Sequence, residues 1–265
     1  MALIDCKFYS EILGLSTSAK VILPQNTKTQ IGMGGAKANG NSSVLYLLHG
    51  LSDDESTWIR RTSIERYVSE KNLIVVMPNG GRSFYTDMAH GCKYFTFITE
   101  ELPELMQQFF HISDKREDTF IAGLSMGGYG ALKIALSCPE KYAAAASLSG
   151  VTDIVRTYED TKKDPHNSIM TADEIQSILG DFTNIKGSKH DLFHLAKELS
   201  EKNCEKPRIY QCCGTEDFLY QDNVKFREFM KQLNYDYTYK EERGIHEWGF
   251  WDKKIQDVLK WLSLE

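Results

Sequence analysis

The sequence predicts an α/β protein whose core is a mostly parallel, doubly wound sheet. Residues 43–48 and 73–77 are short, nearly continuous apolar runs, as expected of strands buried on both faces of a parallel sheet. Segments with apolar residues at helical spacing separate such runs and continue the alternation along the chain. We find no internal repeat and no linker in residues 1–265, so we expect one domain with an insertion at about residues 151–205.

The elements of the N-terminal half follow from their apolar patterns. Residues 6–24 alternate apolar and polar side chains in two stretches, which predicts an antiparallel strand pair at one edge of the sheet. The next residues predict, in order, a strand at 43–48, a helix at 63–71, a strand at 73–77, a long loop at 79–94 and a helix at 95–110.

The C-terminal half repeats the alternation on both sides of the insertion. It predicts a strand at 143–148 and, after the insertion, a strand at 208–213, a helix at 221–233, a strand at 235–241 and a terminal helix at 250–262. The insertion is polar, and we expect two helices in it, at 172–179 and 192–200. Its scattered apolar side chains suggest an apolar underside, which would make the insertion a cap over a site.

One motif lies between a predicted strand and a predicted helix: Gly123-Leu124-Ser125-Met126-Gly127 fits G-x-S-x-G. A turn this tight leaves no room for Cβ atoms at its outer positions, which explains the two glycines. The turn would expose the Ser125 hydroxyl at a helix N-terminus, where the helix dipole favours developing negative charge. We therefore expect a nucleophile at this position rather than an inert serine in a glycine-rich turn.

A serine hydroxyl needs a base, usually a histidine that a buried carboxylate orients. Ser125, Asp217 and His246 occur in the order nucleophile, acid and base, and each directly follows a predicted strand. Because parallel strands end at one edge of a sheet, the three side chains could converge there. Asp222 and Asp153 are the rival acids; the first lies too far into the next helix, and the second follows an earlier strand.

Cleavage of an acyl bond also needs N–H donors for the oxyanion. The candidates are the backbone N–H of Met126, next to the serine, and that of Leu51, which follows His49-Gly50 at the end of another predicted strand. Gly50 would let the backbone turn so that the Leu51 N–H points inward. His49 itself is expected to be a structural hydrogen-bonding residue rather than a base.

Four motifs together resemble a known family: His-Gly-Leu-Ser-Asp-Asp-x-x-x-Trp at 49–58, Met-Pro-Asn-x-Gly-Arg-Ser-x-Tyr-Thr-Asp-Met at 77–88, Gly-Leu-Ser-Met-Gly-Gly-Tyr-Gly-Ala at 123–131 and Gly-x-His-x-Trp at 244–248. They are similar to the esterase D group of α/β-hydrolases, and most similar to bacterial tributyrin esterases and feruloyl (cinnamoyl) esterases. The resemblance covers nearly the whole chain except a glycine-rich loop at 32–40 and the insertion.

The resemblance implies an α/β-hydrolase fold with Ser125, Asp217 and His246 as the catalytic triad, and no metal or organic cofactor. It implies a serine carboxylesterase for short acyl or aryl-acyl esters, such as acetyl, butyryl or feruloyl esters, that works through an acyl-enzyme. The natural partner would then be a small-molecule ester. We also expect Trp58 and Trp248 in the substrate pocket.

Other functions remain open at this stage. An S-formylglutathione hydrolase of the same wider group cleaves a thioester, but glutathione is acidic and the sequence shows no concentrated basic pocket. An acyltransferase like the mycolyltransferases, which are secreted, is a further alternative. A non-catalytic binding protein on a hydrolase scaffold would usually lack one of the three triad residues. A metal site could also use His190, His194 and Glu198, although chance spacing on a solvated surface explains these three better.

Composition and charge limit the classes of binding partner and the location that we expect. The formal net charge is −6, and no basic stripe offsets it, which argues against nucleic acid. No apolar run approaches the roughly 18 residues of a membrane span, so we expect no membrane partner. The first residues lack the apolar core of a secretory signal, and the six cysteines are expected to be reduced, buried thiols, so a cytoplasmic location is predicted. A homo-oligomer is compatible with the sequence.

Overall fold

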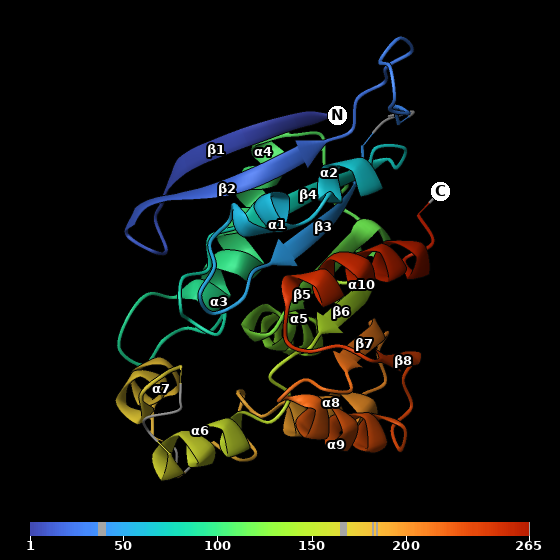
Figure 1. Cartoon of the computed structure of the whole chain (residues 1–265). Helices are drawn as coiled ribbons and strands as arrows, with labels where there is room; N and C mark the ends of the chain where they lie inside the picture. The colour runs from blue at the N-terminus through green and yellow to red at the C-terminus, as the bar shows by residue number, and fades with distance from the viewer. Residues whose placement is uncertain (37–40, 165–168, 182, 184, 265) are drawn as a thin grey trace.

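An eight-stranded sheet forms the centre of the structure, a computed structural model that describes residues 1–36, 41–164, 169–181, 183 and 185–264. The strands are β1 (Ala2–Ser10), β2 (Leu15–Leu23), β3 (Ser43–Leu48), β4 (Leu73–Pro78), β5 (Thr119–Leu124), β6 (Ala144–Leu148), β7 (Arg208–Gly214) and β8 (Tyr237–Glu242). Their order in the sheet is β1-β2-β4-β3-β5-β6-β7-β8 (Figure 1). β2 pairs antiparallel with β1 and β4, and all the other neighbours are parallel.

Helices cover both faces of this sheet. They are α1 (Thr57–Arg61), α2 (Ile64–Tyr67), α3 (Tyr94–Thr96), α4 (Leu102–Phe109), α5 (Met126–Ser137), α6 (Ile154–Lys163), α7 (Ala172–Leu179), α8 (Leu192–Glu201), α9 (Tyr220–Met230) and α10 (Trp248–Trp261). The side chains of α4, α5 and α8 belong to one apolar cluster, and those of α1, α2 and α10 to a second. The mostly parallel, doubly wound sheet predicted from the sequence is confirmed.

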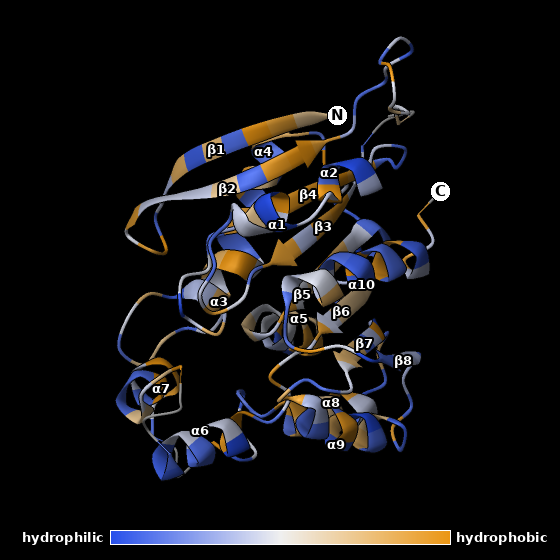
Figure 2. Cartoon of the chain, in the orientation of Figure 1, coloured by the Kyte–Doolittle hydropathy of each residue, from blue (hydrophilic) through white to orange (hydrophobic). Residues whose placement is uncertain are grey.

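The alternation of side chains along each strand supplies both clusters. On β3, Val44, Tyr46 and Leu48 contribute to the first cluster, whereas Leu45 and Leu47 contribute to the second. All five are buried, as a strand between two helical layers requires. Figure 2 shows mostly apolar residues along β3 and, in contrast, a largely hydrophilic α6.

The structure corrects the expected elements at a few places. The helix expected at 63–71 is only the short α2, and the helix expected at 95–110 is a continuous helical segment with a π-turn at Phe97–Glu101. Pro103 lacks the N–H that would normally reach the carbonyl of Thr99, and the Lys141 ammonium donates to that oxygen instead, at 2.8 Å.

The segment between β6 and β7 holds three described helices, α6, α7 and α8, where the sequence predicted two. The missed helix is α6, whose N-terminal cap is Asp153; its carboxylate accepts a hydrogen bond from the Arg156 N–H at 3.1 Å. The loop after β4 is attached to this segment by a bidentate ion pair between Arg82 and Glu174 on α7.

Two other expectations concern the environment of the chain. None of the helices in the described part of the protein is long and apolar enough to span a lipid bilayer. All six cysteines are described and carry free thiols. Cys212 and Cys213 are buried on β7 as predicted, but Cys204 is exposed, so burial does not hold for every thiol.

Candidate active site

The turn between β5 and α5 places Ser125 in a backbone conformation that few residues adopt. Its φ is 53° and its ψ is −117°, and it stands directly before the first residue of α5. A Cβ atom on Gly123 would lie 2.4 Å from the backbone of Gly127, and one on Gly127 would lie 2.5 Å from the Leu48 carbonyl oxygen. Both glycines are therefore required by close backbone packing, as the sequence predicted.

The structure brings the three predicted catalytic side chains together. The Nε2 atom of His246 lies 3.0 Å from Ser125 Oγ, and its Nδ1 atom lies 2.9 Å from Asp217 Oδ2. The Asp217 side chain is fully shielded from solvent, and one of its oxygens also accepts the Leu219 N–H at 2.9 Å. These distances are those of a nucleophile, a base and an orienting carboxylate in one hydrogen-bonded chain.

The loops that carry the acid and the base are packed directly against each other. Asp217 follows β7 and His246 follows β8, the neighbouring parallel strand. A Cβ atom on Gly214 would lie only 2.3 Å from the Gly244 carbonyl oxygen, so the backbones of the two segments can approach this closely only because residue 214 is glycine. The rival acids have other partners than His246: Asp222 pairs with Arg156, and Asp153 pairs with Lys225 at 2.6 Å.

The turn after β3 is fixed by His49. The Gly80 N–H donates to His49 Nε2 at 2.9 Å, so the proton of the neutral ring is on Nδ1, which donates to the Gly50 carbonyl at 2.7 Å. Burial lowers the pKa of this imidazole, which favours the neutral form. His49 is therefore a structural residue, as predicted, and it holds the backbone just before Leu51.

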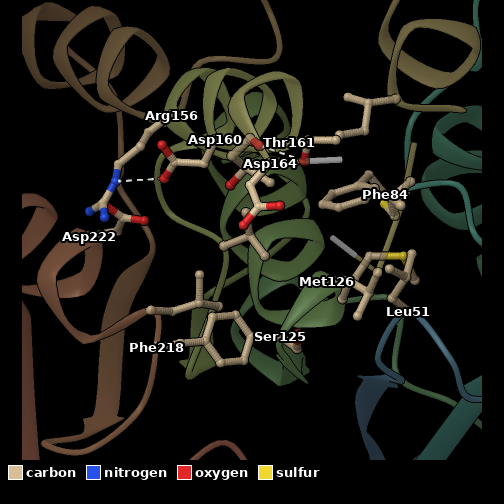
Figure 3. A pocket seen from close by; sticks show the side chains of 16 residues that line it. Leu51, Phe84, Ser125, Met126, Arg156, Asp160, Thr161, Asp164, Phe218 and Asp222 are labelled. Carbon is tan, nitrogen blue, oxygen red and sulfur yellow. Dashed lines mark hydrogen bonds and ion pairs between the residues drawn. The ribbon is translucent and has the colours of Figure 1, made fainter. Parts of the chain in front are cut away.

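A cavity of about 400 Å³ opens beside Ser125 (Figure 3). Leu51 and Met126, the two predicted sources of oxyanion N–H groups, line it together with the serine. Met126 is the first residue of α5, so its N–H has no partner within the helix. The side chains of Phe84 and Phe218 contribute apolar surface to the wall of the cavity.

The opposite end of the cavity is acidic. Figure 3 shows Asp160 and Asp164, at the C-terminal end of α6, across the cavity from Ser125. Arg156 also lines the cavity, but its guanidinium is already paired with both Asp160 and Asp222. The helix α6, which the sequence did not predict, therefore presents polar side chains to the cavity, whereas the expected apolar underside comes from residues that follow α6. Apolar Met170 and Ile175 line it from the residues that follow.

The structure places the two predicted pocket tryptophans away from this cavity, one in the core and the other packed against it. The Trp58 side chain is fully buried, and its indole N–H donates to the Leu48 carbonyl at 3.0 Å. Trp248 packs against it with 5.1 Å between ring centroids. Neither residue lines the cavity beside Ser125. The sequence motifs that contain these tryptophans do not indicate whether their side chains line a pocket or pack in the core.

The alternative metal ligands do not converge. His190 is buried, contrary to the expectation of a solvated surface, and its Nδ1 lies 3.2 Å from Lys133 Nζ. His194 instead pairs with Glu198 at 3.6 Å on the exposed face of α8. Within the described residues, no three His, Cys, Asp or Glu side chains are grouped closely enough to hold a metal ion.

Lys133 is a buried cation on the helix that follows Ser125. Its ammonium donates to Thr86 Oγ1 at 2.6 Å, and the rings of Phe95 and Tyr129 flank it. Burial, followed by the charge of Lys189, lowers its pKa to about 7. The folded protein therefore releases this proton far more readily than the unfolded chain, in which lysine titrates near 10.5.

This difference predicts a pH-dependent stability. Between pH 7 and 10.5 unfolding takes up a proton at Lys133, so the free energy of unfolding rises with pH in that window. The variant Lys133→Met lacks this contribution, and its stability relative to the wild type should fall by about 1 kcal/mol per pH unit above pH 7. Urea unfolding of both proteins at pH 7 and 9.5 measures it. A difference that stays constant would contradict a lowered pKa.

Comparison with known proteins identifies the family. The family model described as "Putative esterase" matches residues 10–262. An acetyl esterase of Caldicellulosiruptor saccharolyticus is 33% identical over 264 residues, which cover 99% of this chain and 98% of the relative.

Two solved structures from Staphylococcus aureus are similar over their full length. Fluorophosphonate-binding serine hydrolase F (FphF) superimposes with a TM-score of 0.86 at 34% identity, covering 100% of this chain and 99% of the other. An S-formylglutathione hydrolase (FrmB) superimposes with a TM-score of 0.83 at 35% identity, covering 98% of each chain. The α/β-hydrolase fold expected from the resemblance is thereby confirmed. The chain belongs to the esterase family and is a carboxylic ester hydrolase of the serine esterase type.

Proposed function

We propose that the protein hydrolyses esters of short acyl or aryl-acyl groups, of the acetyl, butyryl or feruloyl type, with Ser125, His246 and Asp217 as its catalytic triad. The observation that carries the proposal is the position of Ser125 Oγ, 3.0 Å from His246 Nε2 and at the wall of the cavity. The hydroxyl that the histidine can deprotonate thus faces the space in which a substrate fits. The apolar wall around it suits an acyl group.

The first half of the reaction forms an acyl-enzyme. Ser125 Oγ attacks the ester carbonyl carbon while His246 Nε2 takes the hydroxyl proton, and the carbonyl oxygen becomes an oxyanion. Asp217 accepts the hydrogen bond from Nδ1 and stabilises the imidazolium. Collapse of the tetrahedral intermediate breaks the bond to the alcohol oxygen, which leaves with the proton from His246.

The second half reverses these roles with water. His246 takes a proton from a water molecule, whose oxygen attacks the acyl carbon, and then returns the proton to Ser125 as the carboxylic acid leaves. The backbone N–H groups of Leu51 and Met126 would hold the oxyanion in both halves. The ordered His49 turn supports the first donor, and the start of α5 supports the second.

The segment between β6 and β7 would act as a cap of the one hydrolase domain, at about residues 151–205. It contributes Arg156, Asp160 and Asp164 to the cavity wall. Two backbone hydrogen bonds attach α7 to the loop after β4, from the N–H groups of Ala89 and His90 at 3.0 and 2.8 Å. The cap would therefore determine which esters enter, while the triad supplies the chemistry.

The similarity to an S-formylglutathione hydrolase favours a thioesterase as the alternative. The charges of the cavity argue against it for this chain. Asp160, Asp164 and Asp222 line the cavity with one guanidinium, that of Arg156, which two of these carboxylates already occupy. Glutathione carries a net negative charge, and no unpaired cation among the described lining residues is available to bind its carboxylates.

A panel of substrates tests the proposal. We expect p-nitrophenyl acetate and butyrate, or methyl ferulate, to be hydrolysed with a kcat/KM at least about tenfold above that for S-formylglutathione, the ratio that the lack of one ion pair to the substrate produces. The variant Asp160→Asn releases Arg156 from one partner, so it should raise the ratio of thioester to ester hydrolysis.

The opposite ranking in the wild type would favour the thioesterase. A protein that reacted with none of the panel, and left Ser125 unmodified by a fluorophosphonate, would be a binding protein on a hydrolase scaffold. The expectations of no nucleic-acid partner and of a cytoplasmic location stay predictions.

A further inference from the structure

Phe218 combines exposure with a place in the candidate site. Its side chain is 66% exposed, although the residue lines the cavity that contains Ser125. Single exposed apolar residues are common on protein surfaces, so exposure alone indicates nothing. The contact with the base makes this ring different: its centroid lies 4.5 Å from that of the His246 imidazole, at an interplanar angle of 47°.

The turn that holds the acid also fixes the backbone that carries this ring. Phe218 stands between Asp217 and Leu219, and the Leu219 N–H donates to the Asp217 carboxylate at 2.9 Å. The Tyr220 N–H donates to the Asp217 carbonyl at the same distance of 2.9 Å. Both bonds tie the backbone on either side of Phe218 to the acid. The backbone that carries the ring is thus fixed next to the acid, and the ring itself lies against His246 while most of its surface stays open to a ligand.

The chemistry of the leaving group connects this position to the substrate. His246 Nε2 must donate its proton to the alcohol oxygen, so that oxygen has to come within hydrogen-bonding distance of the imidazole. The substituent on the oxygen then extends past the ring that lies against the imidazole. Figure 3 shows Phe218 beside Ser125, on the side of the cavity away from Phe84.

We propose that Phe218 determines specificity for the alcohol part of the ester, binding an aryl or other flat apolar alcohol against its exposed face. The inference rests on the proposed roles of Ser125 and His246 and extends them to a substrate class. A bound aryl group would cover apolar surface that water now contacts, and an offset or edge-on ring pair adds to that gain. An alkyl alcohol as small as ethanol offers little surface to cover.

Phenyl acetate and ethyl acetate separate the contributions, because both give the same acetyl-enzyme. In Phe218→Ala we expect kcat/KM for phenyl acetate to fall about tenfold, and that for ethyl acetate to change by less than about twofold. The deacylation rate, measured after a burst of phenol release, should be unchanged because the alcohol has already left. Phe218→Leu, which keeps part of the apolar contact, should lose less.

Phe109→Ala is the matched control, since this ring on α4 is also exposed, at 47%, but does not line the cavity. It should leave the ratio of the two acetates unchanged. An equal fall for both acetates in Phe218→Ala, with slower deacylation, would show that the ring only supports His246 and would overturn the specificity proposal alone. A wild-type protein that hydrolysed neither acetate would overturn the proposed function and this inference with it.

Discussion

Ser125→Ala is expected to lower kcat by roughly 10⁴ to 10⁶ while leaving the fold intact. The substitution removes one oxygen atom, and with it the nucleophile that His246 would deprotonate. The backbone bonds of the turn remain, because the N–H of residue 125 donates to the Leu148 carbonyl and its own carbonyl accepts the Tyr129 N–H. Steady-state hydrolysis of p-nitrophenyl acetate and a thermal melt measure the two parts of the prediction.

Ser263→Ala is the matched control for this experiment. Ser263 also has a positive φ, of 53°, but it lies after α10 at the exposed end of the chain. Both variants place an alanine at a position with positive φ, and only one loses the candidate nucleophile. The control should keep full activity and fluorophosphonate labelling. A Ser125→Ala protein with a tenth of the wild-type activity would exclude Ser125 as the nucleophile.

The arrangement of the candidate site could be predicted from the sequence because parallel strands end at one edge. Ser125, Asp217 and His246 are distant in the chain, yet they follow β5, β7 and β8, all of which run in the same direction in the sheet. The order of residue types along the chain and the apolar runs before each of them were enough to place the three together. The two glycines on either side of Ser125 were predictable for a different reason, because the tight turn leaves no room for a Cβ atom.

The polar wall of the cavity could not be predicted in this way. Apolar periodicity reveals a helix that packs on a core. The helix α6 instead presents Arg156 and Asp160 to a cavity, and Asp164 follows at its C-terminal end, so the pattern looks like that of a polar loop. The signal that could have revealed it is Asp153, a favourable N-cap residue at the end of the preceding turn.

The burial of individual side chains could not be predicted from the sequence either. Trp58 belongs to a motif beside the site, and nothing in that motif shows that its N–H is satisfied by a strand carbonyl in the core. The converse holds for Phe218: the sequence places it next to the acid, but only the structure shows that its ring is exposed and lies against the base. To predict pocket residues one must know which way side chains point, whereas to predict the triad it is mainly necessary to know where strands end.

Asp217→Asn is expected to lower kcat by about 10⁴ with little loss of stability. The amide has the same shape as the carboxylate, but it carries no charge to stabilise the imidazolium. Its NH₂ group can also donate to His246 Nδ1, which would move the ring proton to Nε2 and leave no acceptor for the Ser125 hydroxyl. Since the Asp217 side chain is fully shielded, water cannot replace the lost charge. Activity on p-nitrophenyl acetate and urea unfolding measure the two effects.

Asp153→Asn separates this role from a general effect of removing a buried carboxylate. Asp153 was a rival acid in the sequence, and its side chain is nearly buried and paired with Lys225 at 2.6 Å. Asparagine is also a good N-cap, so α6 should keep its first turn. We expect this variant to retain activity within about tenfold of the wild type, because the carboxylate has no contact with His246. If Asp153→Asn were inactive and Asp217→Asn were not, the acid would have been assigned to the wrong strand end.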